Sequence, residues 1–150
     1  MARSEFSFFF PLRVRYSEID GQMLVFNAHY LTYFDTAITE FFRALPYDYQ
    51  GQVERRDEDY HTVKTLVEYY TPIRFDDEIE VGVRSARIGR TSLTFGLEIY
   101  PKGRDERLAS GEVVWVNTNQ TTHRPAPLPA ELVEKLQAFE GGDGGARRHP

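Results

Sequence analysis

The 150-residue sequence predicts a single α+β domain in which one long helix packs against an antiparallel sheet. An apolar stripe with helical spacing begins near residue 28, and four runs with strand-like alternation follow it, joined by short turns. A fifth strand-like run precedes the helix. We therefore expect five antiparallel strands around one enclosed helix, with a second, short helix near the C-terminal end.

The first strand is expected within residues 6–16, where apolar residues alternate with Arg13 and Arg15. A turn over residues 21–27 should lead into a helix over 28–43, because apolar residues there recur at i, i+3 and i+4. Threonines occupy the opposite face. The stripe consists of Tyr30, Tyr33, Phe34, Ala37, Ile38 and Phe41. A helix that is apolar over so much of its circumference should be enclosed by the rest of the domain.

A polar, charge-rich connection is expected over residues 47–60. The strands that follow are expected over 61–70, 78–87, 91–100 and 107–117, and the short helix over 129–139. In the first of these strands, one face is predicted to carry Val63, Thr65, Val67 and Tyr69. Residues 1–140 should form the domain. Residues 141–150, with four glycines and no apolar cluster, should be a disordered tail.

Composition excludes several classes of function. The formal net charge of −5 argues against nonspecific nucleic-acid binding. The absence of cysteine excludes disulfides, a thiolate nucleophile and cysteine metal ligands. His61, His123 and His149 are too scattered for a metal site, and no glycine-rich phosphate loop opens a helix, so we expect no cofactor. Without a signal peptide or a stretch of about 18 apolar residues, a cytoplasmic location and no membrane span are expected.

The segment before the long helix carries the chemistry. Asp20 ends the extended segment, and Asn27 and Ala28 lie where the helix begins. A helix N-terminus presents free N–H groups and a partial positive charge. An acid, an oxyanion site and an apolar wall are the parts that hydrolysis of an ester or thioester needs. The same residues also fit a simpler interpretation, in which Asp20 only caps the turn or the helix.

This segment and the order of elements resemble the hotdog-fold acyl-CoA thioesterases of the 4-hydroxybenzoyl-CoA thioesterase family. The resemblance covers about residues 8–139. Many members read Asp-x-x-Gly-His-Val-Asn-Asn-x-x-Tyr, and here Asp20, Val25, Asn27 and Tyr30 match in register. The chain departs from the pattern at three positions, Met23, Leu24 and Phe26. The family's glycine is therefore absent from its usual place in the turn.

The resemblance implies that the Asp20 carboxylate attacks the thioester carbonyl or activates a water molecule that does so. It implies that the backbone N–H of Asn27 or Ala28 polarises the carbonyl. In one branch of the family, a Tyr four residues before the Asp and a His seven residues after it join the catalytic set. Tyr16 holds the first of these positions, and Asn27 holds the second in place of the His.

The resemblance also implies substrate contacts. Tyr30 and Phe34 on the helix should line the channel for the acyl group. Asp35, at the edge of the apolar stripe, is either a substrate contact or a solvated carboxylate. Arg90 and Ser92 lie at a strand turn where relatives meet the phosphates of coenzyme A; a solvated turn arginine is the alternative.

The expected function is hydrolysis of an acyl-CoA to a free acid and coenzyme A, by a homodimer or a tetramer built from dimers. Coenzyme A is then part of the substrate. The sites are expected at the subunit interface, with Asp20 of one subunit facing strands of the other. Two alternatives stay open: a non-catalytic acyl-binding module of the same fold, and, less favoured because Asp20 and His29 are wrongly spaced, a hotdog dehydratase.

Overall fold

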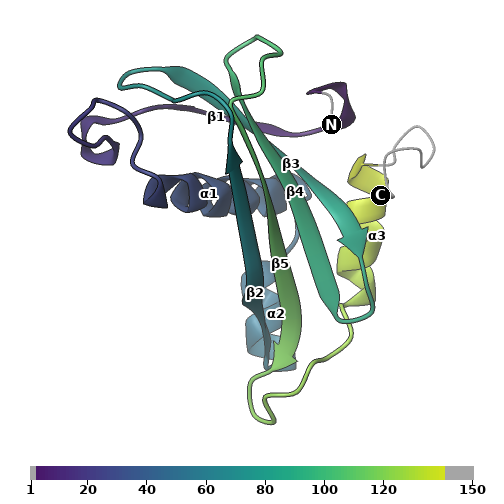
Figure 1. Cartoon of the computed structure of the whole chain (residues 1–150). Coiled ribbons are helices and arrows are strands. Elements are labelled where there is room, and N and C mark those ends of the chain that lie inside the picture. Colours follow the sequence, from purple (N-terminus) through teal and green to yellow (C-terminus); the bar gives the residue numbers. More distant parts are fainter. Residues whose placement is uncertain (1–2, 141–150) are drawn as a thin grey trace.

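A computed structural model describes residues 3–140 of the chain. Five strands form one antiparallel sheet in the order β1-β3-β4-β5-β2 (Figure 1). They are β1 (Phe9–Arg13), β2 (Glu58–Tyr69), β3 (Glu78–Ile88), β4 (Ser92–Pro101) and β5 (Ala109–Asn119). The helices α1 (Ala28–Ala44), α2 (Tyr49–Arg56) and α3 (Ala130–Glu140) and the single turns η1 (Arg3–Glu5) and η2 (Tyr16–Glu18) complete the fold. The predicted α+β class and five-stranded sheet are confirmed.

The core lies between α1 and one face of the sheet. The side chains that α1 buries completely are Phe34, Ala37, Ile38 and Phe41. The ring of Phe34 lies directly against Gly111 of β5, where a Cβ atom would overlap the ring and come within 2.7 Å of the Leu66 carbonyl oxygen. The helix can approach the sheet this closely because Gly111 has no side chain. The predicted apolar stripe is buried, but the predicted enclosure of the helix is wrong in part, because the opposite face of α1, with Thr32, Thr36 and Thr39, is exposed.

The alternation predicted for residues 61–70 is interrupted. A β-bulge lies between Thr62 and Lys64, so Val63 has no partner in β5. Tyr60 and Val67 both pack against the core although seven residues separate them. An odd separation in a regular strand would put them on opposite faces, and the extra residue of the bulge restores both to the helix side.

The connection predicted over residues 47–60 is wrong in part, because α2 lies within it and β2 begins at Glu58. Helix α2 is held by a buried polar side chain, Gln52, which is only 2% exposed. Gln52 accepts a hydrogen bond from the Tyr60 hydroxyl at 2.9 Å and donates one to Asn117 at 3.0 Å. A helix anchored by hydrogen bonds has no apolar stripe, so periodicity in the sequence did not reveal it.

No helix within residues 3–140 is long and apolar enough to cross a membrane. The cytoplasmic location stays a prediction. The tail expected at residues 141–150 lies outside the described residues.

Replacing Gly111 by Ala should lower the free energy of unfolding by about 2 kcal/mol, because the added methyl group would overlap Phe34 and crowd the Leu66 carbonyl. The matched control is Gly96→Ala in β4, where the new Cβ would lie 3.5 Å from Ala86. Chemical denaturation of both variants measures the difference. Equal stability of the two variants would show that the close packing of α1 on the sheet does not require a glycine at position 111.

Candidate active site

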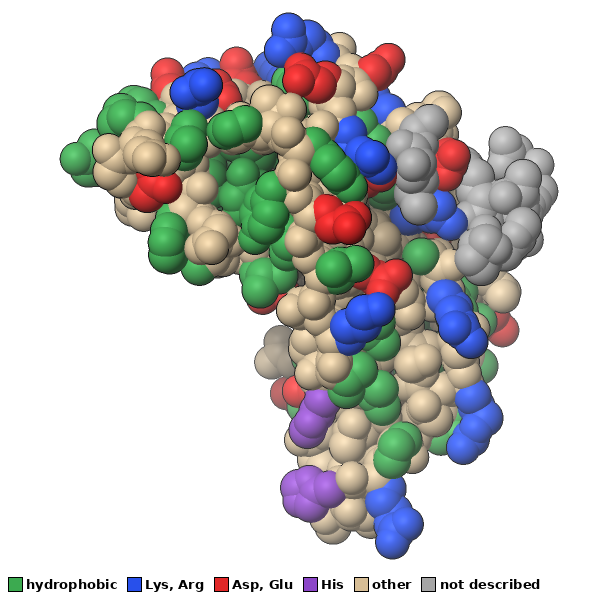
Figure 2. Space-filling view, in the orientation of Figure 1, with side chains coloured by type: hydrophobic (Ala, Val, Ile, Leu, Met, Phe, Trp, Pro, Cys, Tyr) green, Lys and Arg blue, Asp and Glu red, His purple; other side chains and the backbone are tan. Residues whose placement is uncertain are grey.

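Asp20, Asn27 and Tyr30 line one open pocket of about 370 Å³ at the N-terminal end of α1. The other lining residues are Leu24, Val25, Phe26, Tyr69 and Pro72. Asp20 is the one charged residue in this lining, and most of the wall is apolar. Hydrophobic side chains also gather over the loops beside the start of α1, at the upper left of Figure 2. The fold thus brings together three of the residues that the sequence singled out.

Asp20 shapes the turn that leads into the helix. Its Oδ1 atom accepts hydrogen bonds from the backbone N–H groups of Gln22 at 2.8 Å and Leu24 at 3.3 Å. Its own N–H donates to the Leu24 carbonyl at 2.8 Å. Within residues 3–140, the Oδ2 atom has no hydrogen-bond partner. One carboxylate oxygen therefore caps the turn, as the simpler interpretation held, while the other is available for chemistry.

The start of α1 leaves two backbone donors unused. Phe26 donates its N–H to the Glu18 carbonyl at 2.9 Å, and the His29 N–H donates to the Phe26 carbonyl at 2.9 Å. The N–H groups of Asn27 and Ala28, which lie between them, find no acceptor among the described residues. Such groups at a helix N-terminus favour an anion, and Asn27 lines the same pocket as Asp20.

Met23 forms the corner of the turn with a φ of 65°, in the left-handed region. Its N–H donates to the Asp20 carbonyl at 3.0 Å, and its carbonyl accepts from the Phe75 N–H at 3.0 Å. Glycine, which the family motif has at this position, adopts such a φ without steric cost. The turn is therefore of the kind that glycine favours, but it is built on a methionine whose Cβ crowds the backbone.

Two tyrosine rings form an aromatic wall of the pocket. The centroids of Tyr30 and Tyr69 are 4.8 Å apart with the rings nearly perpendicular. Tyr30 is 4% exposed, and this burial, aided by Tyr69, raises the pKa of the Tyr30 hydroxyl. The hydroxyl is therefore neutral at physiological pH. The family resemblance implies that the strand of His61 and Tyr69 lies next to the pocket in a dimer, but the sequence does not show which face of the strand is used, so Tyr69 is not among the predicted site residues.

Three of the predicted site residues lie outside this pocket. Phe34, expected to line the acyl channel, is buried in the core against Gly111 and does not line the pocket. Tyr16 is 75% exposed, and its ring packs edge-on against Phe75 with a centroid distance of 6.1 Å. Asp35 is exposed on α1, although partial burial of its carboxyl raises its pKa. Neither lies in the pocket lining.

Arg90 and Ser92 lie at the β3–β4 hairpin. Figure 1 shows this hairpin far from the start of α1, where the pocket lies. Ser92 and His61 both pair with Val116 of β5, so they lie at the same level of the sheet. His61 precedes Tyr69 by eight residues along β2. That separation corresponds to about 25 Å. A single copy of the chain therefore does not bring these two residues to Asp20.

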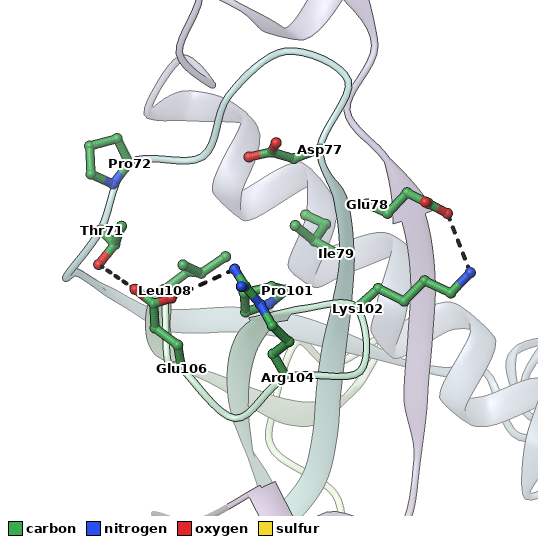
Figure 3. Close-up of a pocket in the computed structure, with 10 residues that line it drawn as sticks. All are labelled: Thr71, Pro72, Asp77, Glu78, Ile79, Pro101, Lys102, Arg104, Glu106 and Leu108. Carbon is green, nitrogen blue, oxygen red and sulfur yellow. Dashed lines mark hydrogen bonds and ion pairs between the residues drawn. The ribbon is translucent and has the colours of Figure 1, made fainter.

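A second hollow of about 410 Å³ adjoins the first and shares Pro72 with it (Figure 3). Lys102 lies 3.4 Å from Glu78 there, and Arg104 lies 4.0 Å from Glu106. Because each cation has a carboxylate beside it, this hollow presents no unpaired positive charge to an anionic ligand.

Met23→Gly is expected to be more stable than Met23→Ala by about 0.5–1 kcal/mol, because alanine keeps a Cβ in the left-handed region. The neighbouring pair Gln22→Gly and Gln22→Ala is the control, since Gln22 does not have a positive φ. Glycine should be the less stable member of that pair. Thermal denaturation of the four variants measures both differences, and the same order at both positions would show that Met23 is not strained.

Comparison with known proteins identifies the family of the chain. Residues 14–136 match the model of the thioesterase-like superfamily. The Escherichia coli protein named acyl-CoA thioester hydrolase YbgC is 29% identical over 130 residues, covering 87% of this chain and 96% of that protein.

Solved structures of similar proteins point to the same family. A thioesterase from Thermus thermophilus, complexed with coenzyme A and Zn, is 31% identical with a TM-score of 0.76, covering 91% of this chain and 97% of that one. A Pseudomonas aeruginosa protein has a TM-score of 0.81 at 29% identity, covering 93% of this chain and 95% of that one. The chain therefore belongs to the thioesterase-like superfamily and has the hotdog fold of its thioesterases.

Proposed function

We propose that the chain hydrolyses acyl-CoA thioesters, with Asp20 as the reacting carboxylate. One observation carries the proposal: the available Oδ2 atom of Asp20 and the unused N–H groups of Asn27 and Ala28 belong to one apolar pocket. The names of the Escherichia coli and Thermus thermophilus relatives, an acyl-CoA thioester hydrolase and a thioesterase complexed with coenzyme A, support this substrate class.

The pocket supplies the parts of an acyl transfer. The thioester carbonyl oxygen accepts hydrogen bonds from the helix N–H groups, which stabilise the negative charge that develops on it. The carbonyl carbon is then attacked either by Asp20 Oδ2 or by a water oxygen whose proton passes to Asp20. In both routes the carbon–sulfur bond breaks and coenzyme A leaves as a thiolate. By the first route, water then cleaves the acyl–Asp20 anhydride.

The acyl group would lie against Tyr30, Tyr69 and Phe26. Removing an oxyanion donor from a site of this kind typically costs about 3 kcal/mol of transition-state stabilisation. Asn27 contributes through its backbone, since its side chain makes no capping hydrogen bond. Tyr16 and Phe34, which lie outside the pocket lining, have no direct part in this mechanism.

The edge strand of the sheet suggests how Arg90 and Ser92 take part. Among the described residues, β2 pairs only with β5, and residues 61–70 are exposed except for Val67. A long, exposed edge strand favours pairing with another strand. Antiparallel pairing of two β2 strands about a two-fold axis places the end of one strand beside the start of the other. Each Asp20 pocket would then adjoin Arg90 and Ser92 of the partner subunit.

The charge on Arg90 suits this role. Among the described residues, its guanidinium group has no hydrogen bond or ion pair, and the residue is exposed. Only its carbonyl is engaged, by the Leu128 N–H at 2.8 Å. A free guanidinium group binds phosphate oxygens in a bidentate manner, and the coenzyme A end of the substrate carries phosphates. We therefore propose a dimer with two sites, each completed by both subunits.

Asp20→Asn should lower kcat for acyl-CoA hydrolysis about 10²- to 10⁴-fold, because the amide can neither attack nor accept a proton. Stability should change little, since the amide oxygen can still accept from Gln22 and Leu24. Assays with short, long and aromatic acyl-CoAs measure the loss. Asp105→Asn, in an exposed turn, is the control and should match the wild type.

Undiminished hydrolysis by Asp20→Asn would remove Asp20 from this role. A wild-type protein that binds acyl-CoAs but hydrolyses none would support the non-catalytic binding module instead.

The shared site can be tested by mixing two inactive variants. Asp20→Asn and Arg90→Ala place their defects in different halves of the site, so each mixed dimer has one site with both defects and one intact site. Random mixing should restore about a quarter of wild-type activity, because half of the dimers are mixed and half of their sites are intact. The variants are refolded together and assayed at a subsaturating concentration of substrate.

No recovery above the sum of the separate variants, with mixed dimers shown by mass spectrometry, would overturn the shared site. A single species at 17.4 kDa in solution would overturn the dimer itself.

A further inference from the structure

A buried pair of side chains lies directly beside the candidate site. Glu18, two residues before Asp20, is 4% exposed although it carries a carboxylate. Its Oε1 atom accepts a hydrogen bond from the Tyr33 hydroxyl of α1 at 2.8 Å. The carboxylate also accepts from the backbone N–H of Arg15 at 2.8 Å and from two nitrogens of the Arg15 guanidinium group, at 2.9 and 2.7 Å.

The backbone of Glu18 makes a second connection across the same turn. Its carbonyl oxygen accepts the Phe26 N–H at 2.9 Å. Phe26 directly precedes Asn27 and Ala28, whose N–H groups are unused. Glu18 therefore connects the loop before Asp20 to two other segments. One is Phe26, which directly precedes the unused N–H groups, and the other is the second turn of α1.

We infer that Glu18 and Tyr33 form a positioning pair, which fixes the distance between the Asp20 carboxylate and the helix N–H donors of the thioesterase reaction proposed above. Neither residue lines the Asp20 pocket, and both line a separate hollow of about 320 Å³, so we assign neither a direct contact with the reacting thioester. Their hydrogen bond ties the loop that carries the acid to the helix that carries the donors. A reacting group must stay within a fraction of an ångström of its working position, and errors of about 1 Å can cost 100-fold in rate.

The ionisation states of Glu18 and Tyr33 are consistent with this positioning role. Burial alone raises the pKa of Glu18, but the hydrogen bonds from Arg15 and Tyr33 outweigh it and leave the pKa below its usual value. Burial, followed by the hydrogen bond to Glu18 and its charge, raises the pKa of Tyr33. At neutral pH the pair is thus a carboxylate and a neutral hydroxyl, which form a strong, charge-assisted hydrogen bond.

The test is Tyr33→Phe, which removes one hydroxyl group and keeps the ring. We expect kcat to fall about tenfold while KM stays within about twofold, because alignment is lost but substrate contacts remain. Tyr100→Phe is the matched control. Tyr100 is also buried and donates its hydroxyl to a glutamate, Glu98, but it lies on the sheet face opposite α1. The control should lose stability to a similar extent and keep its kcat.

Glu18→Gln is the second variant. It keeps an oxygen for the Tyr33 hydroxyl, but its amide nitrogen cannot accept from the Arg15 guanidinium group, so kcat should fall at least as far as in Tyr33→Phe. The same kcat in Tyr33→Phe and Tyr100→Phe would overturn the positioning role.

Hydrogen exchange tests the same inference without any assay of hydrolysis. In Tyr33→Phe, the amides of Leu24 and Phe26 should exchange about tenfold faster than in the wild type, because their acceptors belong to the released loop, while Leu97 of β4 should not change. Unchanged exchange at Leu24 and Phe26 overturns the inference even if no acyl-CoA is hydrolysed. Faster exchange in a protein without activity would leave the pair in place and remove only the proposed function.

Discussion

The close packing of α1 on the sheet is the constraint on which the rest of the structure depends. Phe34 lies against the backbone of β5 because Gly111 has no side chain, and the bulge at Val63 keeps Tyr60 and Val67 on the face of the sheet that packs against the core. With its buried side chains interlocked in this way, the helix has one position on the sheet. That position decides where the first turn of the helix, with its unused N–H groups, meets the end of β2.

The acid is placed by a separate set of interactions, which are polar. The turn over residues 20–24 is closed by Asp20 itself and by the left-handed Met23, while Glu18 connects the loop to α1 through Tyr33. Apolar packing thus positions the donors, and buried hydrogen bonds position the carboxylate relative to them. Such bonds are directional, so they specify a separation that apolar contact alone leaves loose.

The residues of the proposed site come from opposite ends of the sheet. The end with the Asp20 pocket supplies the acid and the aromatic wall, whereas the free guanidinium group of Arg90 lies about 25 Å away along the strands. The exposed edge of β2 lies between them. Two-fold pairing of that edge accounts for both the separation and the exposure, because it brings opposite ends of two sheets together.

The sequence by itself determined the α+β class, the long helix with its buried apolar stripe, the four strands after it and the placing of Asp20 beside the helix start, since each depends on periodicity or on neighbours along the chain. Only the tertiary structure decided that Phe34 belongs to the core, that Tyr69 joins the pocket, that α2 exists, and that Glu18 bonds to Tyr33. Each of these depends on contacts between segments far apart in the chain or on a polar anchor, and neither leaves a periodic signal in one sequence.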